Sequence, residues 1–456
     1  MMARQHDHAP ALAGGSAPPL DLYSDGAAML PLLQAQLPGF GEVGLRITGI
    51  RVHAARRSTS VARNPIPLSL CYDLEVSDTQ QGRSGTQTCF AQVYRPGLAE
   101  AAQGRVNTRQ LVRPAFGEPL VLLPALNLLL WALPNDPDMP HLPALLDPAL
   151  ALQALPPGCG AEPGDELGVE LLRYAPQRRA TLRYTVAARA GRPERAIYAK
   201  TFFDQRARDI HRRFEHFWQL SQRDPLAPLV AEPLGHDAAT RSVWQASALG
   251  LPLLQALASP QAPQLMERVA QALVLLHESG LQPTAGAAPH SVPHWLAEVS
   301  RRRNKLDRIK PELAERTARI AATLTAHAAR PAQRPLSLIH GDCHPDQMWV
   351  HEGRIVLFDF DEFTLGDPME DLASFVLKLE QAEQPEALGR ALVRAYAAAA
   401  PRRFDAQALA WHLAIQSLLQ VSRTFIYQRP GWAEELDSRL AAAETRILAL
   451  QLSHPA

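Results

Sequence analysis

Alternating hydrophobic and polar positions predict two separate blocks of β-strands in the chain. The first block follows an amphipathic stretch over 25–37 that is typical of a helix. Its strands are predicted over 44–54, 68–76 and 86–94, and a further apolar run covers 120–133. Residues 134–164 are rich in proline and glycine, so they predict turns with short helices.

The second block starts near Leu167 and leads into a long helical region. Its strands are predicted over 169–174, 180–188 and 195–203. A helix over 205–220 and short strands near Leu229 and Val243 follow. After Gly250 the pattern is helical almost throughout, apart from residues 336–360.

The two blocks share a short sequence pattern. Tyr72 precedes Gln92 by 20 residues in the first block, and Tyr184 precedes Lys200 by 16 residues in the second. One interpretation is that the first block is a degenerate copy of the second, with glutamine in place of lysine. Convergent strand patterning is the other interpretation, and the shortness of the match favours it.

Composition and charge exclude several classes of protein. The 456 residues suit two or three domains, and 46 basic residues balance 46 acidic ones, which removes a global attraction to nucleic acid or membrane. The four cysteines form no C-x-x-C pair, which indicates free thiols in a reducing compartment. Residues 1–20 lack the apolar segment of a secretory signal and predict a disordered tail, and the run 120–133 is too short to span a bilayer. We therefore expect a cytoplasmic protein.

A hairpin within 348–358 brings polar side chains together. Strands over 348–351 and 354–358 are joined by Glu352-Gly353, a two-residue turn with glycine where a positive φ is needed. This register pairs Gln347 with Phe358, so Gln347 and Asp359 are neighbours at the open end. Asp342 lies on the loop that leads into the same end.

Two carboxylates and an amide at one place suit phosphoryl transfer. That reaction needs a base near the acceptor hydroxyl and oxygen ligands for magnesium on the nucleotide phosphates. The spacing from Asp342 to Gln347 also equals the spacing from Asp to Asn in the protein-kinase H-R-D-x-x-x-x-N loop.

Two motifs in this region resemble a known enzyme superfamily. Residues 340–347 read H-G-D-C-H-P-D-Q and resemble the H-G-D-x-H-x-x-N signature of the aminoglycoside phosphotransferase and choline kinase superfamily. The D-F-D of 359–361 and the G-D-P-M-E-D-L-A of 366–373 resemble its second signature, in the same order. The resemblance implies an α+β, protein-kinase-like fold, with a small antiparallel-sheet nucleotide lobe and a larger helical lobe.

The resemblance also implies roles for the motif residues. Asp342 would be the catalytic base, and Gln347 and Asp359 would hold Mg²⁺. Structural support of the loops is implied for the remaining polar motif residues, which are His340, His344, Asp361, Asp367 and Asp371.

The nucleotide lobe would supply the contacts to ATP. Only four of the 46 basic residues are lysine, and Lys200 lies in an apolar strand, where its compact ammonium would contact the phosphates. Glu215 in the following helix is its expected partner. The remaining candidate nucleotide contacts lie in the first strand connection and in the hinge, and they are Arg178, Arg179, Gln245 and Ser247.

The chain departs from the superfamily pattern at three points. Gln347 replaces the usual asparagine, the connection 174–180 is not glycine-rich, and about 165 residues precede the kinase-like part. Maltokinase-like enzymes share the glutamine and an N-terminal extension, so the resemblance extends to them. The expected domains are a tail over 1–20, an N-terminal α+β module over 21–164, a nucleotide lobe with hinge over 165–250 and a helical lobe over 251–452.

The leading hypothesis is an ATP-dependent small-molecule kinase. The acceptor would be a hydroxyl of a sugar, an amino alcohol or an aminoglycoside, and Asp361, Glu362 and Glu370 are candidates for receiving a cationic acceptor. A nucleotide-binding pseudokinase that acts as a scaffold or regulator is the alternative, which the altered Gln347 favours. The sequence leaves the oligomeric state and the role of the N-terminal module open.

Overall fold

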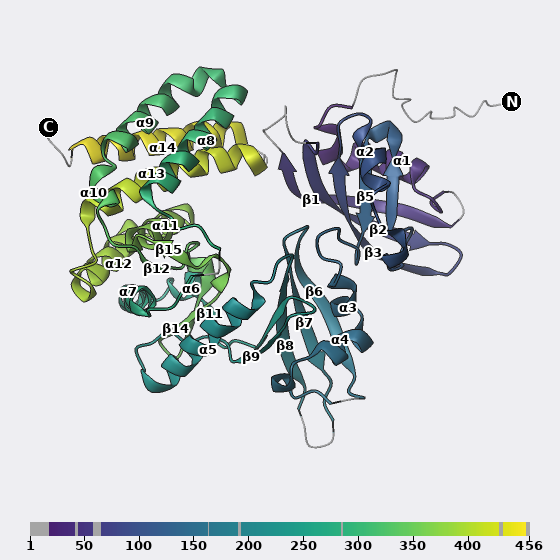
Figure 1. Cartoon of the computed structure of the whole chain (residues 1–456), viewed down its shortest axis with the longest axis horizontal. Helices are drawn as coiled ribbons and strands as arrows, with labels where there is room; N and C mark the ends of the chain where they lie inside the picture. The colour runs from purple at the N-terminus through teal and green to yellow at the C-terminus, as the bar shows by residue number, and fades with distance from the viewer. Residues whose placement is uncertain are drawn as a thin grey trace. The chain divides into compact units, whose positions relative to one another are not determined.

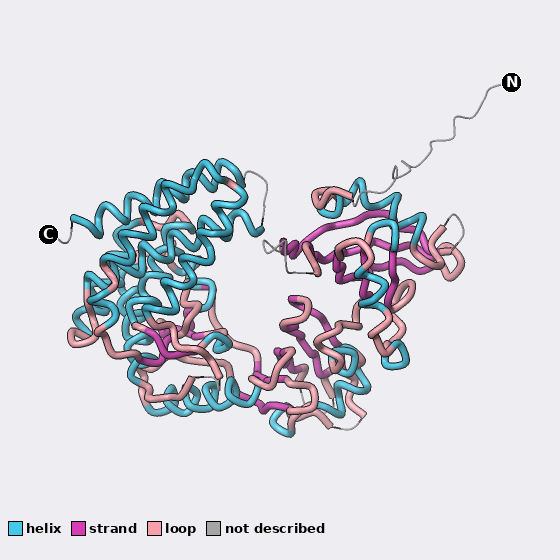
Figure 2. Tube along the Cα trace, turned by 45° about the horizontal axis from the view of Figure 1, so that its top comes forward, coloured by secondary structure: helices cyan, strands magenta, loops and turns pink. Residues whose placement is uncertain are grey.

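The structure is a computed structural model that describes residues 18–41, 44–57, 65–162, 164–189, 193–283, 286–427 and 432–452. Most of the predicted tail over 1–20 lies outside the described residues. The chain forms two compact units: Met1–Ala154 with Val169–Leu182 and Thr201–Phe203, and Leu155–Gly168 with Arg183–Lys200 and Asp204–Ala456. Strands dominate the first part of the chain and helices the last part (Figure 2).

The N-terminal module is built on a five-stranded antiparallel sheet with the order β1-β2-β3-β5-β4 (Figure 1). Three of its strands confirm the predicted ones, and the apolar run 120–133 is a strand, a turn and a second strand. The strands are β1 (Leu45–Arg57), β2 (Leu68–Asp78), β3 (Arg83–Val93), β4 (Leu120–Leu123) and β5 (Leu128–Ala132). The helices of this part are α1 (Gly26–Gln36), α2 (Leu98–Gln103), α3 (Leu142–Leu146) and α4 (Pro148–Ala154).

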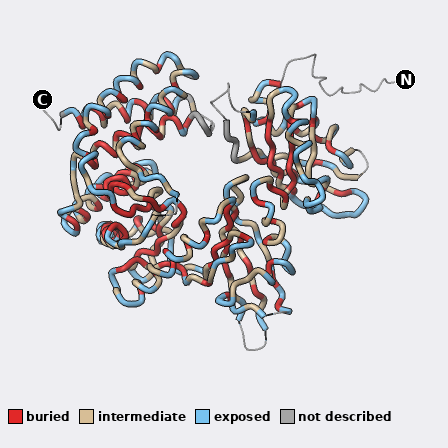
Figure 3. Tube along the Cα trace, in the orientation of Figure 1, coloured by how far each residue is buried: buried red, intermediate tan, exposed pale blue. Residues whose placement is uncertain are grey.

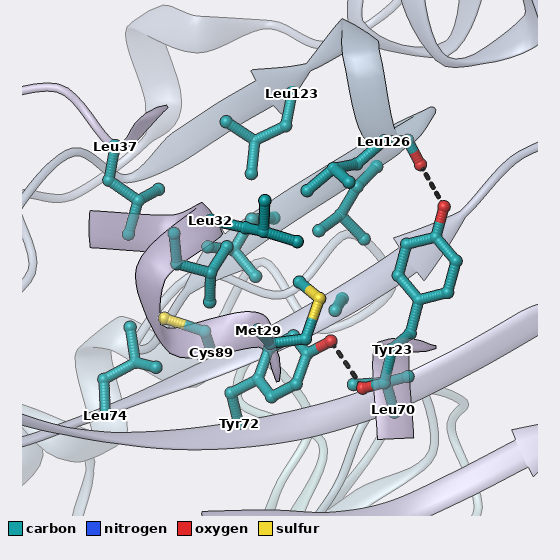
Figure 4. Close-up of a cluster of buried hydrophobic side chains, with 14 of the residues drawn as sticks. Tyr23, Met29, Leu32, Leu37, Leu70, Tyr72, Leu74, Cys89, Leu123 and Leu126 are labelled. Atoms are coloured by element: carbon teal, nitrogen blue, oxygen red, sulfur yellow. Dashed lines mark hydrogen bonds between the residues drawn. The ribbon is translucent and has the colours of Figure 1, made fainter. Parts of the chain in front are cut away.

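The two faces of this sheet have different cores. Alternate residues of a strand point to opposite faces, so Tyr72 and Cys71 of β2 belong to different clusters. The Tyr72 face is covered by α1, and there the Tyr72 hydroxyl donates to the Tyr23 carbonyl at 2.8 Å while the Tyr23 hydroxyl donates to the Leu126 carbonyl at 2.6 Å (Figure 4). On the opposite face Cys71 and Trp131 pack with Ala102 of α2 and with Tyr174.

The second sheet has the order β6-β7-β8-β10-β9. Its strands are β6 (Leu167–Ala175), β7 (Arg179–Val186), β8 (Arg195–Phe202), β9 (Pro233–Asp237) and β10 (Ser242–Ala246), and α5 (Ala207–Arg223) lies between β8 and β9 in the chain. Both sheets therefore run through three consecutive strands, a helix and two more strands, with the last strand beside the third. This repeated order supports the interpretation that the first block is a degenerate copy.

The rest of the chain is mainly helical, with buried and exposed positions alternating along its helices (Figure 3). One of its hydrophobic clusters contains Trp411 and Trp295. The helices are α6 (Leu253–Ala256), α7 (Ala262–Glu278), α8 (Val292–Ile309), α9 (Ala314–Ala326), α10 (Ala329–Ala332), α11 (Pro368–Gln381), α12 (Glu386–Ala399), α13 (Ala406–Tyr427) and α14 (Trp432–Leu452). The short strands of this region are β11 (Leu251–Pro252), β12 (Ser337–Ile339), β13 (Met348–His351), β14 (Arg354–Leu357) and β15 (Thr364–Gly366).

All four cysteines are buried free thiols, as their spacing indicated. Among the described residues, no helix combines the length and the apolar character needed to cross a membrane.

Candidate active site

The predicted hairpin forms with the predicted register. His351 of β13 pairs with Arg354 of β14, and Glu352 and Gly353 between them have φ values of 50° and 74°, which suit a two-residue hairpin turn. At the open end the Phe358 amide donates to the Gln347 carbonyl at 3.0 Å. The hairpin therefore places Gln347 and the residue after Phe358 side by side.

Asp359 is the centre of a compact charged cluster at this open end. Its backbone has a φ of 60°, a left-handed conformation that non-glycine residues rarely adopt. Lys200 Nζ lies 2.9 Å from Asp359 Oδ1 and 2.5 Å from Asp361 Oδ2. The Gln347 side-chain amide donates to Asp359 Oδ2 at 3.2 Å. Three residues chosen from the sequence for nucleotide and metal binding are thus in direct contact.

Asp342 lies on the loop before this cluster, and its side chain is 45% exposed. His344 Nε2 is 3.8 Å from Asp342 Oδ2 and 3.4 Å from the Gln347 amide nitrogen, so His344 lies between the two. Burial by itself would raise the pKa of Asp342, but the His344 imidazole beside it lowers the pKa below its ordinary value. The carboxylate is therefore ionised at neutral pH and accessible, as a base must be.

Asp371 braces the loop that carries Asp342. Its carboxylate is 1% exposed and accepts the backbone amides of His340 at 2.7 Å and Gly341 at 3.0 Å. It also lies 3.1 Å from His277 Nε2, and the other ring nitrogen of His277 bonds to the Tyr396 hydroxyl at 2.8 Å. The buried His340 ring in turn bonds to the Phe358 carbonyl at 2.9 Å, which ties the loop to the hairpin.

Gly341 explains the tight path of this loop. Its φ is 77°, and a Cβ added there would lie 2.4 Å from the Glu362 carbonyl oxygen. Only glycine fits this position without displacing the segment that follows Asp359.

Asp367 and Glu370 hold the beginning of α11. Asp367 Oδ1 accepts the Met369 amide at 3.0 Å, and Asp367 Oδ2 accepts from Arg334 Nε at 2.6 Å. Glu370 is 1% exposed and binds His290 at 2.7 Å. We considered Glu370 as a contact for a cationic acceptor, but this enclosed pairing makes it a structural residue.

The helix after β8 buries Arg213 and not the predicted Glu215. We expected Glu215 to pair with Lys200, yet the Glu215 side chain is 50% exposed and lies 3.3 Å from His211 of its own helix. Residues two apart on a helix do not share a face, and the buried face carries Arg213 instead. Arg213 is 2% exposed and donates to the Phe360 carbonyl at 2.9 Å. Burial lowers the pKa of Arg213 to about 10.

Sequence reasoning missed Arg213, although a signal was present. Ile210, Phe214 and Phe217 form the apolar face of α5, and Arg213 lies among them at helical spacing. A basic residue on an apolar helix face indicates a buried partner.

The other predicted nucleotide contacts lie in two connections. Arg178 and Arg179 are at the turn between β6 and β7, in the first compact unit. Gln245 is half-buried near the end of β10, and Ser247 is exposed just after it. Their role in binding nucleotide stays a prediction.

The donor set at the hairpin end fits a magnesium ion. Among the described residues, no group of three or more His, Cys, Asp or Glu side chains has the geometry of a metal site by itself. Magnesium, however, commonly takes one or two protein oxygens and fills its remaining positions with phosphate and water. Asp359 and Gln347 are candidates for such a pair: the Gln347 amide nitrogen lies 3.2 Å from Asp359 Oδ2, and the oxygen of the same amide would be the second ligand.

One protein-family model matches this part of the chain. Residues 183–412 match the model of the phosphotransferase enzyme family, APH. No curated protein matches the chain closely enough to count as a relative.

Several solved structures resemble the chain at low identity. A thermostable mutant of aminoglycoside phosphotransferase APH(4)-Ia, in complex with ADP and hygromycin B, is 14% identical, covers 63% of this chain and 95% of its own, and has a TM-score of 0.45. ADP-bound APH(2″)-Ib is 15% identical, with 60% and 92% covered and a TM-score of 0.40. A choline/ethanolamine kinase family protein from Mesorhizobium loti is 16% identical, with 68% and 96% covered and a TM-score of 0.45.

The family match spans just over half of the chain and includes Lys200, the loop of Asp342 and the hairpin with Asp359. The chain belongs to the phosphotransferase enzyme family, with its protein-kinase-like α+β fold preceded by an additional N-terminal sheet.

Proposed function

We propose that the protein transfers the γ-phosphoryl group of ATP to a hydroxyl of a small molecule. The observation that carries this proposal is the contact of Lys200, Gln347 and Asp359 at the hairpin end, with Asp342 joined to them through His344. A cation for phosphates, oxygen ligands for a metal and an accessible ionised carboxylate are the parts that phosphoryl transfer needs.

Each group has a distinct role in the proposed reaction. Asp342 accepts the proton of the attacking hydroxyl and orients that oxygen toward the phosphorus. Lys200 holds the nucleotide phosphates and turns from its carboxylate partners toward them. Asp359 and Gln347 would hold Mg²⁺, which supplies positive charge against the phosphate oxygens. Asp371 keeps the loop of Asp342 in place by binding its backbone amides.

The surroundings of Asp342 bear on the choice of acceptor. Two of the three acidic residues considered for a cationic acceptor are enclosed, because the side chains of Asp361, beside Lys200, and Glu370, beside His290, are each only 2% exposed. Lys378 of α11 is half-buried and within electrostatic reach of Asp342. Burial and the charge of Arg423 lower the pKa of Lys378, whereas Asp342 raises it. This mixed charge favours a sugar or another neutral or acidic hydroxyl compound over an aminoglycoside.

The test is magnesium-dependent ATP consumption with a panel of sugars, sugar acids, amino alcohols and aminoglycosides. We expect one class to stimulate turnover in the wild-type protein and not in Asp342→Ala. Because Asp342 is partly exposed, the substitution should leave the melting temperature and ATP binding unchanged.

Three other outcomes would count against the proposal or a part of it. ATP binding without stimulation by any acceptor would favour the nucleotide-binding scaffold or regulator. Absence of nucleotide binding would exclude both functions. Turnover in Asp342→Ala at the wild-type rate would show that another group is the base.

A further inference from the structure

One carboxylate of the N-terminal module bonds to the turn between β6 and β7. Asp136, in the segment after β5, is 4% exposed. Its Oδ1 accepts the amides of Asp138 at 2.9 Å and Met139 at 3.1 Å, which closes a local turn. Its Oδ2 accepts the Tyr174 hydroxyl at 2.6 Å and the Gln177 amide at 2.8 Å. Asp136 thus joins the module to residues about 40 positions later in the chain.

Gln177 is held on both backbone and side chain. Its φ is 59°, a left-handed conformation that costs free energy for a residue with a Cβ. Its backbone amide donates a hydrogen bond to Asp136, as described above. In addition, its side-chain nitrogen donates to Asp138 at 2.8 Å, and its side-chain oxygen lies 3.5 Å from the Gln92 amide nitrogen. The bonds to the N-terminal module offset the cost of this conformation.

Tyr174 anchors the start of the same turn by apolar contact. Its ring packs against the cluster of Cys71, Phe90, Leu129 and Trp131 on one face of the first sheet. The ring and the hydroxyl therefore both bind the N-terminal module, and all of these residues lie in one compact unit.

A second contact reaches the strand that carries Lys200. His141 Nε2 lies 2.8 Å from the hydroxyl of Thr201, which is fully buried and follows Lys200 directly in β8. The Phe203 amide at the end of β8 donates to the Arg178 carbonyl at 3.0 Å, which ties this strand end to the turn.

We infer that the N-terminal module positions the nucleotide-contacting turn, with Asp136 as the residue that holds Tyr174 and Gln177. The turn, residues 176–178, carries Arg178 and continues into Arg179. The turn lacks the glycines that let backbone amides wrap a phosphate, so its contacts to a nucleotide would come from side chains. Those side chains bind best when the turn already holds a single conformation. Fixing the turn before the ligand arrives reduces the ordering cost of binding. The nucleotide part of this inference rests on the function proposed above.

The experiment compares two tyrosine-to-phenylalanine variants of the full chain. Tyr174→Phe removes the hydroxyl that binds Asp136 and keeps the packed ring. Tyr72→Phe is the matched control, because it removes a buried hydroxyl bond to the Tyr23 carbonyl inside the same module, away from the turn. Asp136→Asn is the second test variant, since an amide cannot accept hydrogen bonds at both of its side-chain atoms.

Two measurements are made on each variant. The first is amide hydrogen exchange over residues 174–180 without nucleotide, which reports the turn independently of any activity. The second is the dissociation constant of a non-hydrolysable ATP analogue with Mg²⁺. We expect Tyr174→Phe and Asp136→Asn to speed exchange in this peptide and to weaken ATP binding about five- to tenfold, with the KM of the acceptor unchanged. Tyr72→Phe should change neither.

Each contrary result would overturn a different part of the inference. Wild-type exchange in both test variants, or an equal effect in Tyr72→Phe, would overturn the inference that Asp136 holds the turn. Faster exchange with unchanged ATP affinity would overturn its link to the nucleotide. If the wild-type protein binds no ATP, the proposed function fails together with that link, while exchange alone still decides whether the module fixes the turn.

Discussion

Lys200 Nζ lies 2.9 Å from Asp359 Oδ1, although the two residues are 159 positions apart in the sequence. Asp361 is the second carboxylate on the same ammonium group and is only 2% exposed. The cluster therefore carries a lysine whose charge is balanced within the protein. In the proposed function an incoming phosphate group would compete for this lysine, which would free Asp359 for its proposed role as a magnesium ligand.

Lys200→Ala should lower both nucleotide affinity and stability. Loss of the ammonium leaves Asp359 and the buried Asp361 without this partner, and removing one member of a buried pair costs about 3–5 kcal/mol. We expect kcat/KM for ATP to fall about 10- to 100-fold when assayed well below the melting temperature. Lys200→Arg should recover little, because a planar fork does not replace a point charge between two carboxylates. Lys310→Ala removes an exposed pair with Glu312 and is the control; equal losses in it would contradict a specific role for Lys200.

Gln347→Ala should raise the magnesium requirement. The amide of Gln347 lies 3.2 Å from Asp359, and we propose its oxygen as one ligand of the ion. Loss of one ligand is expected to increase the Mg²⁺ concentration for half-maximal activity about tenfold, equivalent to ~1.4 kcal/mol. Gln347→Asn keeps the amide, so its magnesium requirement should fall between that of the wild type and that of Gln347→Ala. A magnesium titration that is the same for all three proteins would exclude Gln347 as a ligand.

Asp371→Asn should destabilise the protein and slow catalysis. The carboxylate of Asp371 accepts from His340, Gly341 and His277. An asparagine amide group would face at least one of these donors, so we expect a loss of about 2–3 kcal/mol in the free energy of unfolding. The kcat should fall while the KM for ATP stays the same, because the loop of Asp342 and not the nucleotide contacts is affected.

Urea unfolding and steady-state kinetics measure these effects. Tyr396→Phe, which removes only the hydroxyl bond to His277, should cost about 1 kcal/mol and serves as the graded control. If Asp371→Asn unfolds at the wild-type urea concentration, the brace is not important for stability.

The pair of His290 and Glu370 should make stability depend on pH. Burial would lower the pKa of His290, but the hydrogen bond and the charge of Glu370 outweigh it and raise the pKa above its ordinary value of 6.5. A raised pKa in the folded state gives stability that is complete below pH 6.5 and is lost as the pH rises through the folded-state pKa. The stability difference between the wild type and His290→Gln should therefore be larger at pH 6 than at about pH 9.

His294 supplies an internal control with the opposite sign. Burial, followed by the charge of the adjacent His290, lowers the pKa of His294. A lowered histidine pKa destabilises the folded state as the pH falls, so His294→Gln should gain relative stability at acidic pH. Thermal unfolding at several pH values tests both variants. If the melting temperatures of the wild type, His290→Gln and His294→Gln changed with pH in parallel, neither ring would titrate as described.

Local sequence determined the hairpin and the order of the polar residues on it. The turn pair Glu352-Gly353 and the alternation of 348–358 set a register in which Gln347 and Asp359 are adjacent, and the structure has this register. Strand and helix positions in both blocks also follow from local periodicity, because these elements bury one face each. The sequence therefore predicted these elements and the hairpin that carries the candidate site.

Tertiary structure alone decided which distant groups meet. Helical spacing places Arg213 on the apolar face of α5, but only the tertiary structure shows that its partner there is the Phe360 carbonyl. The sequence also did not predict that Asp136 would bind the turn of Gln177, since such contacts depend on how whole elements pack. The equal strand order of the two sheets is likewise a property of pairing and not of local pattern. Periodicity reports which side of an element is buried, whereas the partner on that side is set only when the elements come together.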